Sequence, residues 1–272
     1  MKKTYLITFL LLTLILPAQL QAQTGTDKSI TKNFFIGLGG AYSDFQDTKY
    51  SDVRESGFGF HFKIGFNNLK KEKHFWELAG SFNYSSENTS THDQGSSMVL
   101  YPNIYFKYLW AVSKTVYVGG RIDAFDNYIK IYTNLNNNST FGTTSNHLYG
   151  SVLYLKDINS NWKFKAVGDL ALIGVQKEGT GFAMSYSQNR IEEGGVDYQD
   201  PNMGDPSSYA YAQFRHIGNN FILKTEYSFM FKKRMEFAYT WEMRRYAVVS
   251  GYPTTWGMHN LVFRYNIVHR EK

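Results

Sequence analysis

The chain has 272 residues, of which 17% are aromatic and 19% are charged, and its formal net charge is +6. The charged fraction is below the roughly 25% of an ordinary soluble domain, and the mild positive charge gives no reason to expect a nucleic-acid partner. There is no cysteine, which excludes disulfides, thiolate metal sites, a cysteine nucleophile and a lipoprotein anchor. Many aromatic residues with few charges indicate a chain that borders both an apolar and a polar medium.

The first 22 residues have the pattern of a secretory signal peptide. Lys2 and Lys3 give a positive start, an apolar run of about 11 residues follows, and Ala22 offers a small residue for cleavage. A membrane-spanning helix needs about 20 apolar residues, so the run is too short for one. We therefore expect a signal peptide over 1–22, a short periplasmic arm over 23–32 and the folded domain over 33–272.

The rest of the chain alternates between apolar and polar residues with a period of two. Between positions 57 and 66 every even position is Phe or Ile, and every odd position is Gly, His or Lys. Successive side chains of a strand point to opposite faces, so this segment predicts a strand with one wholly apolar face. The same alternation recurs over 34–42, 76–84, 98–110, 116–123, 162–172, 221–231, 237–243 and 261–267.

Two architectures produce such alternation: a soluble β-sandwich and a transmembrane β-barrel. The segments are longer than the usual five or six residues of a strand in a soluble protein. Aromatic residues such as Tyr42, Trp76 and Trp110 lie at the ends of the apolar faces, where interfacial girdles form. Short turns also alternate with longer loops. We predict an all-β, antiparallel up-and-down transmembrane barrel in the outer membrane of a Gram-negative bacterium, with outer-membrane lipid around it.

The number of strands depends on how the stretch 176–207 is interpreted. A weak alternating segment over 182–188 gives twelve strands, within a range of ten to fourteen, and without it ten or eleven remain. An even number returns the C-terminus to the periplasm, where short turns belong. We therefore expect twelve strands, inserted by the barrel-assembly machinery, and the oligomeric state stays open.

The face opposite the apolar one carries charges that must meet water or one another. By alternation it holds nine basic and five acidic residues. A hydrated pore with a slight anion preference is one expectation; a closed, salt-bridged interior in a structural or docking component of an envelope complex is the other. The expected lumen residues are Lys63, Glu77, Lys107, Arg121, Asp123, Lys163, Lys165, Asp169, Lys224, Glu226, Lys232, Glu242, Arg244 and Arg264.

Hydrolase motifs are weak in this chain. In length, strand number and location it resembles outer-membrane phospholipase A, whose motif is His-x-Ser-Asn. The nearest match, His216-Ile217-Gly218-Asn219, has glycine where that family has its nucleophile, so no hydroxyl is available. Ser145 and His147 share a strand face in the reverse order and have no assignable acidic partner. We expect no enzyme activity and no catalytic, cofactor or metal residue, with a barrel lipase as the least favoured alternative.

The signal-peptide end Gln21-Ala22-Gln23 and the Tyr/Asn-rich strands resemble outer-membrane barrel proteins of the Bacteroidota. The stretch Tyr209–Phe221 is similar to a Tyr-x-Ser-Asn-His-Phe strand of putative porins in that group, and departs from it at 218–221. The resemblance implies a barrel fold and an outer-membrane location. It carries over no catalytic or binding residue.

Overall fold

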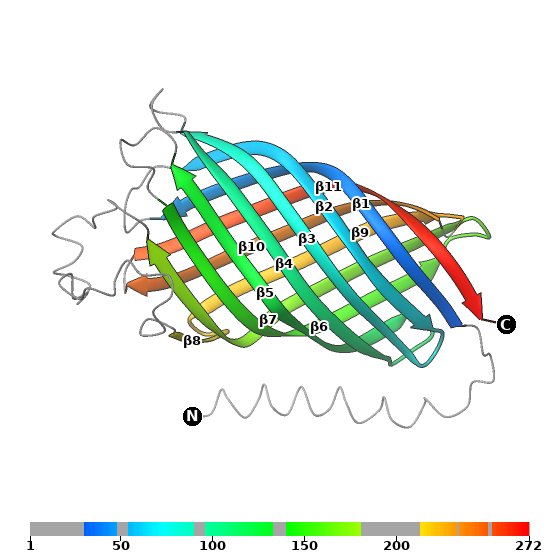
Figure 1. The fold of residues 1–272 in the computed structure, drawn as a ribbon. Coiled ribbons are helices and arrows are strands. Elements are labelled where there is room, and N and C mark those ends of the chain that lie inside the picture. The colour runs from blue at the N-terminus through cyan, green and yellow to red at the C-terminus, as the bar shows by residue number, and fades with distance from the viewer. Residues whose placement is uncertain are drawn as a thin grey trace, which may run out of the picture.

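The computed structural model describes residues 30–47, 54–89, 96–132, 140–180, 213–232, 234–249 and 252–271. These residues form eleven strands in one antiparallel sheet (Figure 1). None of them belongs to a helix long and apolar enough to cross a membrane. The strands are β1 (Ile30–Asp47), β2 (Glu55–Lys70), β3 (His74–Thr89), β4 (Ser96–Ala111), β5 (Val116–Tyr132), β6 (Thr140–Asp157), β7 (Trp162–Thr180), β8 (Gln213–His216), β9 (Asn220–Phe231), β10 (Met235–Val249) and β11 (Tyr252–Glu271).

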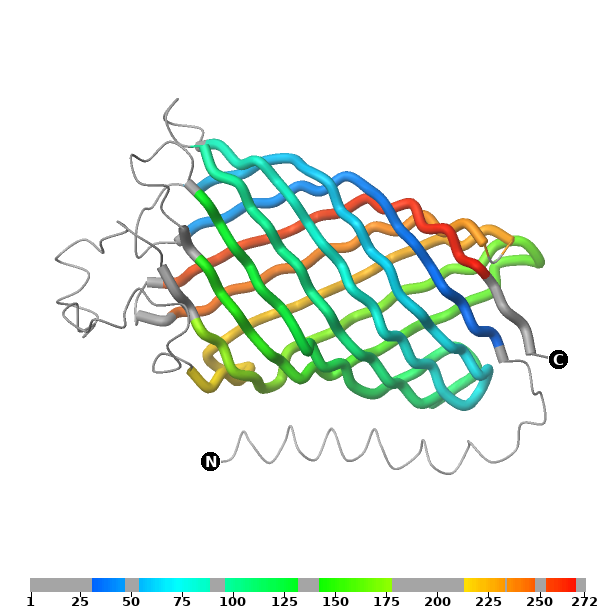
Figure 2. The backbone as a smooth tube through the Cα atoms, viewed as in Figure 1, coloured from blue at the N-terminus to red at the C-terminus, as the bar shows by residue number. Residues whose placement is uncertain are grey.

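The sheet closes into a barrel because β11 pairs with β1 along the whole length of β1, from Ile30 opposite Glu271 to Asp47 opposite Thr254. Strands that follow one another in the chain are neighbours almost everywhere (Figure 2). The exception is β8, which lies end to end with β9 along the same edge of β7. Ten of the eleven described strands therefore make the ring, and the short β8 extends β9.

The prediction of an all-β antiparallel barrel is confirmed, but the count of twelve strands is wrong. One edge of β7 pairs with β6, and the other pairs with β9 over Trp162–Leu170 and with β8 over Ile173–Gln176. No further strand fits between β7 and β9, and the segment 182–188 lies outside the described residues. In addition, β1 begins at Ile30, inside the segment that we expected to be a periplasmic arm.

The two ends of the barrel differ in their connections. The segments 71–73, 112–115, 158–161 and 232–234 join strands at one end, where the first residue of β1 and the last of β11 also pair. The opposite ends of these strands, such as Asp47, Thr89 and Tyr132, lie at the other end of the barrel, and the longer segments that connect them fall outside the described residues. In outer-membrane barrels short turns face the periplasm. We refer to the two ends as the short-turn end and the loop end.

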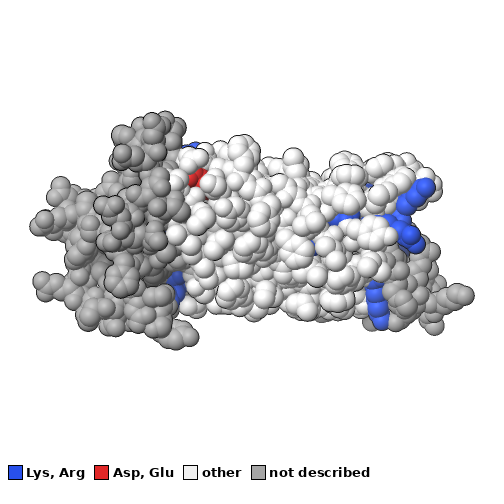
Figure 3. Space-filling view, turned by 45° about the horizontal axis from the view of Figure 1, so that its top comes forward, with Lys and Arg blue, Asp and Glu red and all other residues white. Residues whose placement is uncertain are grey.

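The outer surface of the barrel is an apolar belt. Large hydrophobic side chains stand out from it, among them Phe58, Phe214 and Leu261, which are 76%, 63% and 70% exposed. Figure 3 shows a middle zone without Lys, Arg, Asp or Glu and basic side chains gathered toward the short-turn end. A monomeric soluble protein does not expose so much contiguous apolar surface, whereas lipid hydrocarbon covers such a belt in a membrane barrel. The chain is thus an outer-membrane-type β-barrel.

A bulge in β5 changes which residues face inward. The register of β5 against β6 shifts between Ile122 and Asp126, so that Asp123 and Asp126 are both buried inside the barrel. The side-chain amide of Asn146 donates hydrogen bonds to the carbonyl oxygens of Asp123 and Ala124, at 3.3 and 2.7 Å. These bonds satisfy backbone groups that the bulge removes from the ladder. Strict alternation would have turned Asp126 toward lipid.

Glycines permit close strand contact where β1 and β2 bend. An ideal Cβ on Gly59 would lie 1.7 Å from the carbonyl oxygen of Tyr84, and one on Gly39 would lie 2.0 Å from that of Leu261. No side chain fits at such distances, so these positions require glycine. On the outer face of β7, by contrast, a Cβ on Gly168 would meet nothing within 4 Å.

We expect Gly59→Ala to destabilise the barrel by about 1–3 kcal/mol, because the added methyl must displace backbone of β3. The measurement is a urea titration in detergent, followed by heat-modifiable migration on a gel. Gly168→Ala is the matched control and is expected to leave the midpoint unchanged. Equal midpoints for the two variants would show that the close contact at Gly59 is not a constraint on the fold.

Candidate functional site: the barrel interior

The centre of the interior is organised around the carboxylate of Glu226 on β9. Three cations from three other strands reach it: Lys63 at 3.3 Å, Lys165 at 2.7 Å and Arg264 at 2.7 Å. Lys165 and Arg264 also bind Glu236, at 3.0 and 3.2 Å. All five side chains are buried. We call this group the Glu226 cluster; it ties β2, β7, β10 and β11 to β9 through side chains as well as backbone.

A tyrosine connects this cluster to its neighbour. The hydroxyl of Tyr105 donates a hydrogen bond to Glu77, which also pairs with Lys63 at 3.5 Å. The guanidinium of Arg121 stacks on the Tyr105 ring, 3.8 Å from its centroid. The buried Tyr105 therefore lies between two charged groups and contacts both. Its ring face binds the guanidinium of Arg121, and its hydroxyl donates to the carboxylate of Glu77.

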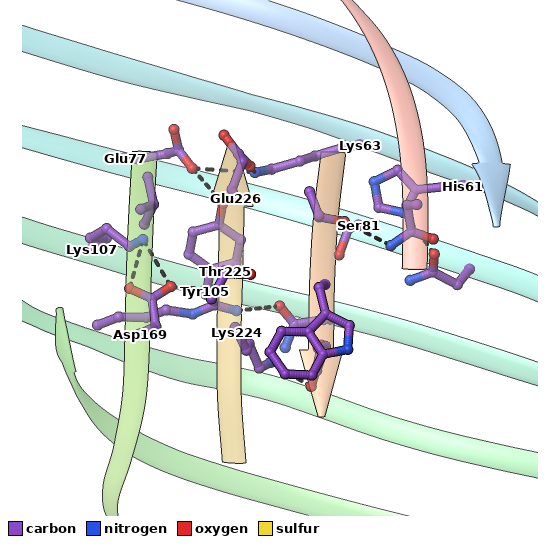
Figure 4. Close-up of a pocket in the computed structure, with 18 of the residues that line it drawn as sticks. His61, Lys63, Glu77, Ser81, Tyr105, Lys107, Asp169, Lys224, Thr225 and Glu226 are labelled. Carbon is purple, nitrogen blue, oxygen red and sulfur yellow. Dashed lines mark hydrogen bonds and ion pairs between the residues drawn. The ribbon is translucent and has the colours of Figure 1, made fainter. Parts of the chain in front are cut away.

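Arg121 is the hub of the second group. It pairs with Asp123 at 2.6 Å and with Asp169 at 3.1 Å, and it donates to the amide oxygen of Asn103 at 3.0 Å. Asp169 also binds Lys107 at 2.8 Å. Figure 4 shows Lys107 and Asp169 pointing toward each other, with dashed lines marking this contact. Each charge in this group therefore has a partner of opposite sign.

The third group extends toward the loop end and depends on the bulge of β5. Lys224 contacts Asp123 at 2.8 Å and Asp126 at 3.1 Å. Arg244 from β10 pairs with Asp126 and, at 2.7 Å, with Glu242. Because the bulge places both aspartates inside, two cations from β9 and β10 find partners on β5.

The lumen is spanned completely at Tyr101. Its hydroxyl accepts a hydrogen bond from Arg244 at 2.6 Å and donates one to Glu242 at 3.0 Å. Tyr101 lies on β4 and the other two on β10, which are opposite each other in the ring. A direct hydrogen bond therefore joins opposite walls of the barrel at this level.

A fourth group lies nearest the loop end. Lys130 from β5 pairs with Glu87 at 2.5 Å and with Glu55 at 2.9 Å. Ser43 also donates to Glu87 at 2.5 Å. The ammonium of Lys130 lies 4.2 Å from the centroid of the Phe45 ring. This group is buried beside apolar side chains rather than open to the barrel mouth.

Apolar side chains pack together inside the barrel at two levels. The outer aromatic layer, toward the loop end, includes a stack of Phe45, Tyr128 and Trp256 with ring centroids 5.6 and 4.8 Å apart. The second layer lies inside the barrel at the short-turn end and is formed by Phe75, Leu109, Ala111, Tyr117 and Leu153. The first three charged groups lie between these two layers, and the Lys130 group lies beside the layer at the loop end.

A small cavity lies among the charged groups. One cavity of about 80 Å³ lies among Lys63, Glu77, Lys107, Asp169 and Glu226 (Figure 4). Sites for small organic ligands span roughly 300–1,000 Å³, so this cavity has room for a few water molecules instead. Among the residues described, no three His, Cys, Asp or Glu side chains lie close enough together to hold a metal ion.

Most of the residues predicted to line the lumen do lie inside it. Lys163 is on the same face of β7 as Lys165 but lies at the short-turn mouth, where its side chain is 23% exposed and pairs with Asp157. Lys232 is exposed in a turn. The remaining predicted residues belong to the groups described above: Lys63, Glu77, Lys107, Arg121, Asp123, Lys165, Asp169, Lys224, Glu226, Glu242, Arg244 and Arg264.

Alternation also missed interior residues. Glu87 and Glu236 continue the inward-facing alternation of β3 and β10, but they lie outside the alternating segments 76–84 and 237–243. Extending those segments along the strands would have predicted both residues to face inward. Asp126 and Lys130 are inward only because of the bulge, which nothing in the pattern announces. Ion pairs between described interior residues join eight basic to nine acidic side chains, and Arg215 is a further buried cation. The predicted basic excess is therefore wrong for the described interior.

The candidate hydrolase residues have other partners. Ser145 is buried and its hydroxyl accepts a hydrogen bond from Arg244 at 3.2 Å. His147 is buried too, and its Nε2 lies 3.0 Å from the side-chain amide nitrogen of Asn220. His216 lies on the outside, where its ring nitrogen accepts from the backbone of Gly218. The described contacts thus give neither histidine a serine to activate.

Known proteins resemble the chain in outline. The match with the outer-membrane protease OmpT from Escherichia coli covers 90% of this chain and 100% of that protein, at 7% identity and a TM-score of 0.47. For the translocator domain of the autotransporter NalP from Neisseria meningitidis the shares are 86% and 87%, with 8% identity and a TM-score of 0.47. For an outer membrane channel from Pseudomonas putida F1 they are 89% and 97%, with 7% identity and 0.34. No family model and no curated protein matches the sequence.

These similarities assign neither protease nor channel activity to this chain, since they are remote in both sequence and shape. Nor do they bear on the resemblance to Bacteroidota proteins. What is plain is the architecture, a closed antiparallel barrel with an apolar outer belt, which is consistent with the outer membrane.

We expect Glu226→Gln to lower the free energy of unfolding by about 3–5 kcal/mol, because three buried cations lose their shared anion. Asp157→Asn removes an exposed partner of Lys163 and is the matched control, with an expected loss of about 0–1 kcal/mol. Urea titration in detergent measures both. If the two losses were alike, the Glu226 cluster would not be a buried, dry network.

Proposed function

We propose that this outer-membrane barrel is non-conducting and serves as a structural or docking component of the envelope, rather than as a porin. The observation that carries this proposal is the chain of ion pairs and hydrogen bonds across the lumen, from Lys63 and Glu226 to Tyr101 and Glu242. The two apolar layers support it, because each covers the charged middle on one side.

Conduction would require this interior to rearrange. An ion crosses a pore with part of its hydration shell, so it needs a continuous wet path. Separating one buried ion pair leaves a charge without compensation, which costs about 3–5 kcal/mol. The near balance of basic and acidic side chains inside also removes the motive for an anion preference, since fixed charges of both signs cancel at short range.

Planar-bilayer recording tests the proposal. The wild-type protein is expected to insert without producing unitary conductance steps, because opposite walls are bonded at Tyr101. A triple variant, Tyr101→Ala with Tyr117→Ala and Trp256→Ala, removes the bridge between the opposite walls and a large ring from each apolar layer, and is expected to leak. Phe60→Ala with Phe229→Ala and Phe237→Ala removes rings of similar size from the lipid-facing side and is expected to stay silent. Regular steps from the wild type would overturn the proposal.

We also expect no phospholipid hydrolysis. Ser145 is buried in the lumen and bonded to Arg244, so a lipid ester does not reach its hydroxyl. Release of fatty acid from detergent-dispersed phospholipid is the assay. Turnover that disappears in Ser145→Ala but persists in Ser151→Ala, a buried serine on the same strand, would establish the lipase alternative instead.

A further inference from the structure

Unpaired basic side chains surround the short-turn end of the barrel. Six of them are exposed, and none forms an ion pair with another described residue. They come from the turns 71–73, 112–115 and 232–234 and from the end of β6, so they are spread around the ring; Figure 3 shows basic side chains at this end. We call this set the short-turn rim: Lys71, Lys73, Lys114, Lys156, Lys232 and Arg234.

Little acidic charge offsets the rim. Asp157 is exposed there, but Lys163 already binds it at 3.3 Å. Glu72 is partly buried between two of the rim lysines. In the interior the clusters of cations are paired with carboxylates, whereas none of the six rim cations forms an ion pair with a carboxylate of the described residues. At the loop end the exposed guanidinium of Arg54 pairs with Asp44 at 2.8 Å.

Aromatic side chains on the outer face fix the depth of the rim. Tyr108 and Trp110 contact each other near the end of β4, with ring centroids 4.9 Å apart, and Trp110 is 57% exposed. Trp162 packs on Phe231 at 4.8 Å on the other side of the barrel. Such rings reside at the level of lipid headgroups. The rim lies just beyond them, at the level of the phosphates.

We propose that the short-turn rim binds the phosphate headgroups of anionic phospholipids in the leaflet that surrounds the short-turn end. Lysine and arginine near a bilayer surface are attracted to anionic lipid, and each adds to the binding. Their distribution around the ring fits a shell of separate lipids better than one compact soluble partner. This binding fixes the height of the barrel in the membrane and does not depend on whether the lumen conducts.

Tryptophan quenching in vesicles tests the proposal, because Trp110 and Trp162 lie beside the rim. The protein is placed in phosphatidylcholine with a minor fraction of phosphatidylglycerol, and brominated acyl chains are carried by one lipid or the other at equal mole fraction. We expect brominated phosphatidylglycerol to quench more strongly, corresponding to about threefold enrichment at the protein surface. Raised salt is expected to reduce the difference by screening.

Two variants locate the effect. Lys71→Gln with Lys73→Gln, Lys114→Gln and Arg234→Gln is expected to abolish the difference between the two brominated lipids. Arg245→Gln removes an exposed cation from the loop end and is expected to preserve it. Heat-modifiable migration checks that both variants are folded. Equal quenching in the wild type, or a preference that survives in the rim variant, would overturn the proposal. So would tight binding of soluble polyglutamate without any lipid preference, which would indicate a soluble acidic partner.

Discussion

A charged side chain inside a narrow barrel loses most of its water, and that desolvation costs several kcal/mol per ion unless opposite charges and hydrogen bonds replace the water. This chain places many charges in that position, and the interior is arranged accordingly. Glu226 receives three cations, and Arg121 is held by two carboxylates and an aromatic ring. Removing any one partner would leave others unpaired, so the network acts as a unit. Because its members come from strands around the ring, the network also fixes the shape of the barrel's cross-section.

The size of the ring makes this pairing possible. Barrel diameter grows with strand number, and large barrels leave an aqueous channel that side chains do not cross. With ten strands in the described ring, Tyr101 reaches Glu242 on the opposite wall. Backbone irregularities adjust the fit: Gly59 lets β2 approach β3 closely, and the β5 bulge turns Asp126 inward to meet Lys224 and Arg244. Fold and interior therefore depend on each other.

The proposed non-conducting interior shifts attention from the lumen to the two ends and the outer surface. The described charges inside are nearly balanced and are joined in ion pairs, so they offer little net charge to a solute. The cations at Lys71, Lys114 and Arg234 are exposed and unsatisfied among the described residues, so they are free to bind something else. The same residue types thus have different roles: inside they pair with carboxylates of other strands, and at the short-turn end we propose that they bind lipid headgroups.

The sequence by itself determined the fold class and most of the lumen-facing residues, and the fold class in turn indicated the outer membrane. The reason is local: a strand has a period of two, so residues such as Lys63 and Arg264 are assigned to a face by their neighbours alone. The ring size, the bulge at Asp126 and the pairing of charges were decided only by tertiary structure. β8 and β9 pair with the same edge of β7. This pairing sets the number of strands in the closed ring, and no local sequence pattern specifies it. Whether Glu226 meets three cations or water depends on strands distant in the chain, and only the closed barrel brings them together.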